Sequence, residues 1–199
     1  MTVILVVIVV SCAIGLARGG SMHNLSLLHL AAWPLVFVAL VVQAFGSFAA
    51  TLGVPGAGAY YVGGMVLSAL FVTYFVYRNR TLPGMALVAL GFLLNALVVA
   101  ANGAMPVEQA AADRAGISTV GLYRNVDAKH ELADEDTLLR PLADIIAVPL
   151  PGPLRRGSNV VSIGDVVLAA GIGVLLVNAM LRVRSAPRPP AHVRRARRS

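Results

Sequence analysis

Five long apolar segments, separated by connections that differ in charge, constrain the fold of this chain more than any other feature. The segments run from Val3 to Ala17, Leu30 to Leu52, Ala59 to Tyr77, Leu82 to Ala101 and Val160 to Leu181. Only the last contains a charged side chain, Asp165. A bilayer core is about 30 Å thick and a helix rises about 1.5 Å per residue, so roughly 20 apolar residues span it. The pattern predicts an all-α, polytopic membrane helical bundle with five transmembrane helices.

The composition agrees with a membrane protein and argues against a nucleic-acid partner. Hydrophobic residues make up 58% of the 199 residues and charged residues only 13%, about half the charged share of a soluble domain. The formal net charge is +7, but seven of the sixteen basic residues lie between Arg182 and Arg198. We therefore expect a five-helix domain over 1–182, including a long loop at 102–159, and a disordered arginine-rich tail over 183–199. Cys12 is the single cysteine, which excludes a disulfide within one chain.

The distribution of arginine predicts the orientation in the membrane, because Lys and Arg concentrate in short cytoplasmic loops. Arg18 lies in the first connection, Arg78 and Arg80 lie in the third, and the second connection has no charge. The loop at 102–159 has six basic and eight acidic residues. We expect a bacterial inner-membrane protein with its N-terminus outside, its C-terminus in the cytoplasm and the long loop outside. The first segment has no basic residue before its apolar run, unlike a signal peptide, so a retained helix is favoured over a cleaved one.

Small and amide side chains form a stripe on each of the last two apolar segments. At 100° per residue, one face carries Gly84, Gly91, Asn95 and Asn102, and the other carries Gly164, Gly171 and Asn178. Glycine allows close helix approach, and an asparagine within the membrane needs a partner. Both stripes are expected to face other helices.

Four polar residues are expected at depths within the outer half of the membrane, where they would form a polar site. Its candidate members are Gln43, Asn95, Asn102 and Asp165. An ionisable residue within a membrane suggests a functional site by default. The competing interpretation of Asp165 is structural and is favoured, because it follows Ser162 by three residues, as in a helix capping box.

The long loop is expected to be partly helical. Pro106 and Gly116 bound a predicted short helix from Glu108 to Ala115. Thr137 can begin an amphipathic turn, and its apolar face carries Leu138, Leu139, Leu142, Ile145 and Ile146. This piece would pack onto the helices, lie on the outer membrane surface or cover the bundle mouth.

The loop also carries the remaining candidate site residues, His130 and Asp144. Potential ligands of a hard metal ion are concentrated at His130, Glu131, Asp134, Glu135 and Asp136. The spacing lacks the glycine turn of a calcium loop, so a solvated acidic face is favoured. We expect no metal and no cofactor.

Several short stretches together resemble a known family. They are 78–84, Asn95, 102–107, His130, 137–139, 142–146 and 159–166. In these the chain is similar to the bacterial small integral membrane proteins labelled domain of unknown function 5317. The resemblance covers roughly residues 1–182 and implies a location and a fold, without a chemistry.

The sequence shows no zinc-protease, serine-hydrolase, Walker or dinucleotide-binding motif. We therefore expect a non-enzymatic membrane component, such as a scaffold, assembly factor or sensor. A small-solute or ion carrier using Asn95, Asn102 and Asp165 is the second interpretation. A membrane-embedded enzyme using Asp144, His130 or Asp165 is the third. The expected partners are the lipid bilayer, anionic lipid headgroups at the tail and a membrane protein that the sequence does not identify.

Overall fold

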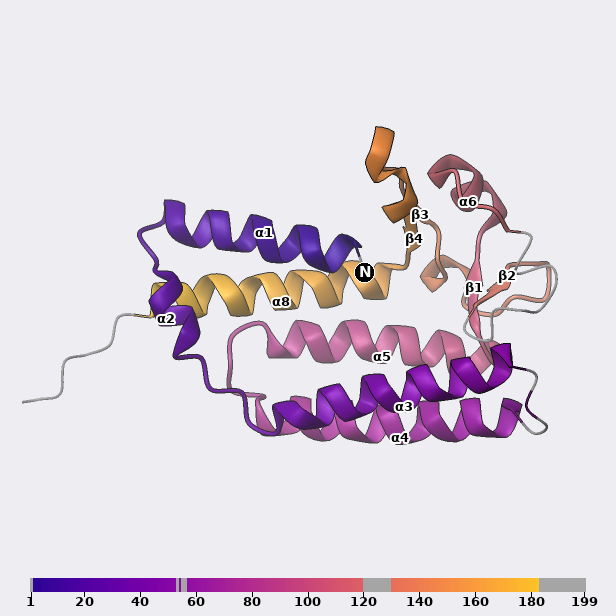
Figure 1. Ribbon diagram of the computed structural model, residues 1–199, viewed down its shortest axis with the longest axis horizontal. Helices are drawn as coiled ribbons and strands as arrows, with labels where there is room; N and C mark the ends of the chain where they lie inside the picture. Colours follow the sequence, from indigo (N-terminus) through magenta and orange to yellow (C-terminus); the bar gives the residue numbers. More distant parts are fainter. Residues whose placement is uncertain (1, 53, 55–56, 120–129, 183–199) are drawn as a thin grey trace, which may run out of the picture.

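The chain is mostly helical, and its long helices coincide with the apolar segments. The computed structural model describes residues 2–52, 54, 57–119 and 130–182. The long helices are α1 (Thr2–Ala17), α3 (Trp33–Thr51), α4 (Ala57–Arg78), α5 (Met85–Asn102) and α8 (Ile163–Leu181). They run side by side along the long axis of the molecule (Figure 1).

Two of these helices, α5 and α8, are long and apolar enough to cross a membrane by length and composition. Within the described residues, α1, α3 and α4 contain shorter apolar stretches at Val3–Ala17, Trp33–Val42 and Val66–Arg78. Only 17% of the apolar span of α5 and 33% of that of α8 are buried inside the protein. Most of each apolar span is therefore exposed on the surface of the protein.

Glycines bring α5 and α8 into close contact, as their stripes predict. A methyl group added at Gly91 would collide with the carbonyl oxygen of Gly164. One added at Gly171 would lie 2.6 Å from the backbone nitrogen of Val88. The stripe on α8 ends sooner than expected, because Asn178 is exposed and donates to the Val174 carbonyl of its own helix. The prediction that Asn178 faces another helix is therefore wrong.

Helices α3 and α4 form a hairpin held by small and polar residues. The Ser68 hydroxyl is fully buried and donates to the carbonyl oxygen of Ala39 at 2.8 Å. Asn79, at the end of α4, bonds both the backbone N–H and the carbonyl of Ala31, at 2.9 and 2.8 Å. This pair of bonds fastens the segment before α3 onto the end of α4.

The short helix α2 (Met22–Ser26) closes the end of α8. Helix ends leave carbonyl groups without partners inside the helix. The Ser21 N–H and the Asn24 side-chain amide both donate to the carbonyl oxygen of Met180, at 3.1 and 2.8 Å. The segment that follows α1 is thereby attached to the C-terminal end of α8.

The opposite end of the helices carries a small folded unit, here called the cap, which comprises residues 103–119 and 130–162. Its elements are β1 (Met105–Val107), α6 (Gln109–Ala115), β2 (His130–Leu132), β3 (Ile146–Val148) and β4 (Asn159–Val161), with 3-10 turns η1 (Arg140–Leu142) and η2 (Gly152–Gly157). Strand β1 pairs in parallel with β2, and β3 pairs antiparallel with β4. The cap core consists of Val107, Ala111, Ala112, Ala115 and Val160.

The cap confirms one sequence prediction and corrects another. The short helix between Pro106 and Gly116 is present as α6, and Gly116 ends it in a left-handed conformation. The amphipathic helix expected from Thr137 is absent from 137–148, a described segment that contains only the turn η1 followed by strand β3. Leu139 has a positive φ of 54° and Pro141 follows it, and neither is compatible with a continuing α-helix. The loop is thus partly helical as expected, and it also contains four short strands that the all-α fold class did not include.

Candidate functional site

Polar side chains from α5 and from the start of α8 meet where these helices reach the cap. The Asn95 amide nitrogen donates to Asp165 Oδ1 at 2.7 Å. The Ser162 hydroxyl donates to Asn95 Oδ1 at 2.8 Å. Two of the four predicted members of the polar site are therefore in direct contact, and Ser162 joins them. We call these three residues the polar junction.

Asp165 also caps its own helix, as the sequence spacing predicts. Its backbone N–H donates to Ser162 Oγ at 2.9 Å, and its Oδ2 accepts the Ser162 N–H at 3.4 Å. Both halves of a capping box are thus present. The same carboxylate caps α8 and binds Asn95 of α5, so it links two helices as well as stabilising one.

The backbone pairing of Asp144 places this residue beside the polar junction. Its N–H donates to the Pro106 carbonyl, and its carbonyl accepts the Glu108 N–H, both at 2.9 Å. Two residues later, Ile146 pairs with Val161, which directly precedes Ser162. The antiparallel register therefore brings Asp144 to the first turn of α8.

The Asp144 side chain is buried without a hydrogen bond at one of its oxygens. The residue is 5% exposed, and its Oδ1 has no partner among the described residues. Burial, followed by the negative charge of Asp165, raises the pKa of the Asp144 carboxyl from 3.8 to about 7. This carboxyl can therefore gain or lose a proton near neutral pH, or balance its charge with a bound cation.

Among the other sequence candidates, Asn102 bonds a different part of the cap. Asn102 lies about two turns beyond Asn95 and clamps Leu138, donating to its carbonyl at 3.0 Å and accepting its N–H at 2.8 Å. His130 is half-buried on β2, where it pairs with Met105. Gln43 lies on α3, and its side chain falls outside the described residues. A ligand-binding role for these three residues stays a prediction.

The acidic segment after β2 is organised by its own hydrogen bonds. Asp134 Oδ1 accepts the Asp136 N–H and the Thr137 hydroxyl, both at 3.0 Å. Partial burial and the nearby charge of Asp134 raise the pKa of Glu131. No cluster of three or more His, Cys, Asp or Glu side chains that could hold a metal lies within 2–52, 54, 57–119 and 130–182.

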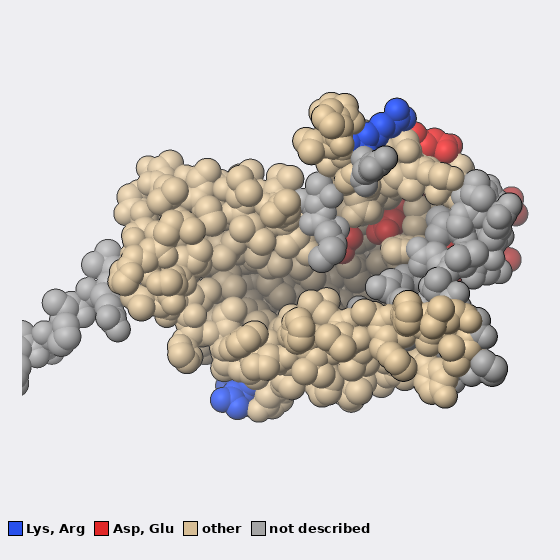
Figure 2. Space-filling model, in the orientation of Figure 1, with Lys and Arg blue, Asp and Glu red and all other residues tan. Residues whose placement is uncertain are grey.

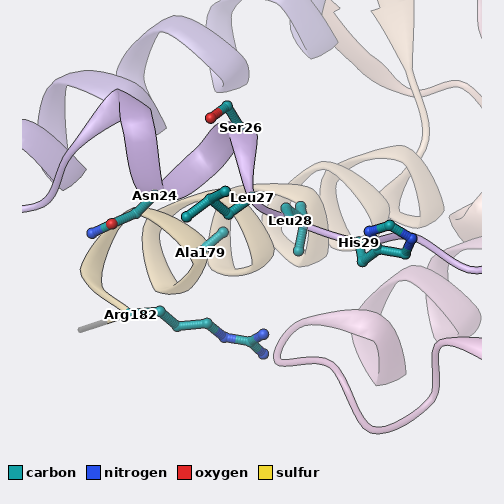
Figure 3. Close-up of a pocket in the computed structure, with 7 residues that line it drawn as sticks. All are labelled: Asn24, Ser26, Leu27, Leu28, His29, Ala179 and Arg182. Carbon is teal, nitrogen blue, oxygen red and sulfur yellow. The ribbon is translucent and has the colours of Figure 1, made fainter. Parts of the chain in front are cut away.

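A second feature lies at the opposite end of the helices, between α2 and the end of α8. It is a cavity of about 490 Å³ lined by Asn24, Ser26, Leu27, Leu28, His29, Ala179 and Arg182. Arg182 extends past the cavity toward the connection between α4 and α5, and His29 lies on the same side (Figure 3). The lining combines the apolar side chains of Leu27, Leu28 and Ala179 with the basic side chains of His29 and Arg182. This combination suits an anionic amphiphile.

Sequence reasoning missed two residues that organise these ends. Asn79 was recognised only as part of a short motif, yet it is 3% exposed and fastens the chain before α3. Asn24 gave no signal beyond its place in a polar connection, yet it bonds the end of α8. An isolated asparagine between two apolar segments was the available clue.

Comparison with known proteins identifies the family. A model described as a family of unknown function, DUF5317, matches residues 27–177. The chain belongs to this family. The match is narrower than the expected 1–182, since it begins after α1 and α2 and ends within α8.

One curated relative of this DUF5317 chain is an uncharacterized protein of Thermotoga maritima, 32% identical over 113 residues. That alignment covers 56% of this chain and 61% of the relative, so the chain spans less than two thirds of that protein. No solved structure matches the chain.

Proposed function

We propose that this protein is a multi-pass inner-membrane component with five crossing helices and a non-enzymatic role. The observation that carries the proposal is the exposure of large apolar side chains along all five long helices. Examples from different helices are Leu5 at 62% exposed, Phe37 at 64%, Leu70 at 61% and Leu93 at 53%. Side chains of this size exposed over whole helices fit a surrounding lipid phase far better than water.

The helix lengths support this proposal. The five helices contain 16, 19, 22, 18 and 19 residues. At about 1.5 Å per residue they are roughly 24 to 33 Å long, close to the hydrocarbon thickness of about 30 Å.

The separation of charge supports an orientation with the cap outside. The connections at Arg18 and at Arg78 to Arg80, together with Arg182, lie at the end of the helices away from the cap. Acidic side chains gather on and below the cap, which also carries basic side chains (Figure 2). By the positive-inside rule the arginine end faces the cytoplasm, which places the N-terminus outside.

The hydrogen bonding of the polar junction favours a structural role over catalysis. Asn95, Ser162 and Asp165 bond one another and cap α8. They therefore connect the cap to the helix pair α5–α8. We propose that the protein presents this cap at the outer membrane surface as a scaffold, assembly factor or sensor.

Cysteine labelling tests the topology. After Cys12→Ser, single cysteines are introduced as Glu135→Cys in the cap and Ser26→Cys at the end of α2, both at exposed positions. A membrane-impermeant maleimide should label the cap cysteine in intact cells and the Ser26→Cys protein only after permeabilisation. The reverse pattern, or extraction of the chain by alkaline carbonate, would overturn the proposal.

A small-cation carrier is the second candidate function, and one observation favours it. The Oδ1 of Asp144, which has no partner among the described residues, lies at the same end of the helices as Asp165. Proteoliposomes should then show cation flux that Asp165→Asn abolishes. Absence of flux in proteoliposomes containing folded protein would reject this candidate and leave the structural role in place.

We also propose anionic lipid headgroups as partners at the arginine end. Arg182 and His29 line the cavity there, and basic pockets at the cytoplasmic surface bind such headgroups. Native mass spectrometry should detect more bound phosphatidylglycerol than phosphatidylcholine, and Arg182→Gln should reduce that preference. Arg140→Gln in the cap is the matched control, and equal effects of the two substitutions would contradict the assignment.

A further inference from the structure

The two carboxylates at the base of the cap carry a negative charge that no described basic side chain balances. Asp165 accepts hydrogen bonds from the Asn95 amide and the Ser162 backbone. Asp144 has no ion pair with a described residue, and Arg140 of the cap is bound instead to Glu108 at 3.0 Å. Both aspartates therefore lie without a counter-charge among the residues that the structure describes.

One oxygen of Asp144 is buried without a hydrogen bond, which makes this side chain a candidate ligand of a cation. Buried polar atoms in folded proteins are almost always hydrogen-bonded, and buried charges are paired or coordinate a metal. Asp144 is 5% exposed, and its solvent-inaccessible Oδ1 has no partner in the described part of the chain. Its backbone is held on both sides by hydrogen bonds to Pro106 and Glu108.

The oxygen-bearing side chains at the junction of the cap with α5 and α8 suit a hard cation. Asp144 interacts electrostatically with Asp165, and the register of β3 with β4 places it at the first turn of α8. Ser162 Oγ and Asn95 Oδ1 add neutral oxygens at the same junction. Carboxylate, amide and hydroxyl oxygens are the ligands that calcium and magnesium prefer.

We propose that Asp144 and Asp165 together bind one divalent cation at the junction of the cap with α5 and α8. Its two positive charges neutralise the two carboxylates and fasten the cap to the helices. Asp165 is only half-buried and provides the route by which the ion enters. The site is independent of the membrane topology and of any transport, because it requires only the folded junction.

Thermal unfolding of the full chain in detergent tests this site. Protein stripped with EDTA is titrated with CaCl₂ or MgCl₂ at about pH 8, above the raised pKa of Asp144, with NaCl at matched ionic strength as the control. An ion that binds only the folded state stabilises it by RT ln(1 + c/Kd), where c is the ion concentration, so the stabilisation keeps growing with the logarithm of that concentration above Kd. The midpoint should rise above that of the NaCl control with at least one divalent ion, and calorimetry should give one ion per chain.

Variants separate this site from non-specific binding. Asp144→Asn and Asp165→Asn should each abolish the rise of the midpoint above the NaCl control, whereas Asp134→Asn, in the exposed acidic segment of the cap, should retain it. Asp144→Asn keeps the size of the side chain, and the variant is therefore expected to fold. A cooperative unfolding transition in EDTA would show that it does. No rise of the midpoint above the NaCl control in the wild type, or an equal rise in folded Asp144→Asn protein, would overturn the proposal.

Discussion

The substitution Asp144→Asn should remove a large part of the pH dependence of stability. The pKa of Asp144 is raised in the folded protein from 3.8 to about 7. A difference of roughly 3 units corresponds to about 4 kcal/mol, since one unit is worth about 1.4 kcal/mol. The residue is 5% exposed, so solvent screens little of this energy.

The sign follows from linkage. A carboxyl whose pKa is higher in the folded state than in the unfolded state favours folding when it is protonated. The contribution of Asp144 to the unfolding free energy is complete below about pH 4, and it is lost as the pH rises through about 7. Without divalent ions, the wild type should therefore lose about 4 kcal/mol of unfolding free energy between these limits through this one group.

The assay is denaturant unfolding of the purified chain in detergent and EDTA at several pH values. The amide introduced by Asp144→Asn cannot ionise, so the variant should have a flatter profile than the wild type. Unpartnered amide hydrogens cost about 1 to 3 kcal/mol, which lowers the whole profile without changing its slope. The Asp165→Asn variant should also have a somewhat flatter profile of unfolding free energy against pH than the wild type, because the charge of Asp165 contributes to the raised pKa of Asp144. Parallel profiles for wild type and Asp144→Asn would refute the reasoning.

Three further substitutions test other contacts. Gly91→Ala should destabilise the α5–α8 pair by about 1 to 3 kcal/mol through overpacking, measured by thermal unfolding. The control Gly63→Ala, at an exposed position with no atom within 4 Å of the added carbon, should have little effect, and equal losses would contradict the packing. Asn102→Ala removes both side-chain bonds to Leu138 and should speed hydrogen exchange at the Leu138 amide; unchanged exchange would show that the clamp does not operate. Asn79→Ala breaks buried bonds at the end of α4 and should cost about 1 to 3 kcal/mol, whereas a loss within measurement error would mean that water replaces them.

Features encoded over short stretches of sequence were predictable. The apolar segments, the glycine stripes that bring Gly91 against Gly164, and the capping box of Ser162 with Asp165 all appear in the structure. Each depends on helical spacing along a single segment, which the order of residues specifies directly. Asn178 was predicted wrongly to face another helix. Periodicity identifies which residues share a face of a helix, but it does not show whether a neighbouring helix covers that face.

Contacts between distant segments were harder to predict. The segment after Thr137 has helical apolar spacing, yet Asn102 of α5 holds Leu138 and the chain turns at Leu139. Tertiary hydrogen bonds and a positive φ overrode the local pattern there. The sequence predicted that Asn95 and Asp165 approach one another. It did not predict that the Ser162 hydroxyl donates a hydrogen bond to Asn95.

The sequence by itself determined the long apolar helices and the uneven distribution of charge between their connections, because these depend on composition and on a period of 3.6 residues. The tertiary structure alone decided that β3 pairs with β4 and thereby brings Asp144 beside Asp165. The sequence separation of 21 residues between these aspartates carries no information about their distance. The register of β3 with β4 determines that distance, and with it the approach of two carboxylates that no described basic side chain pairs with.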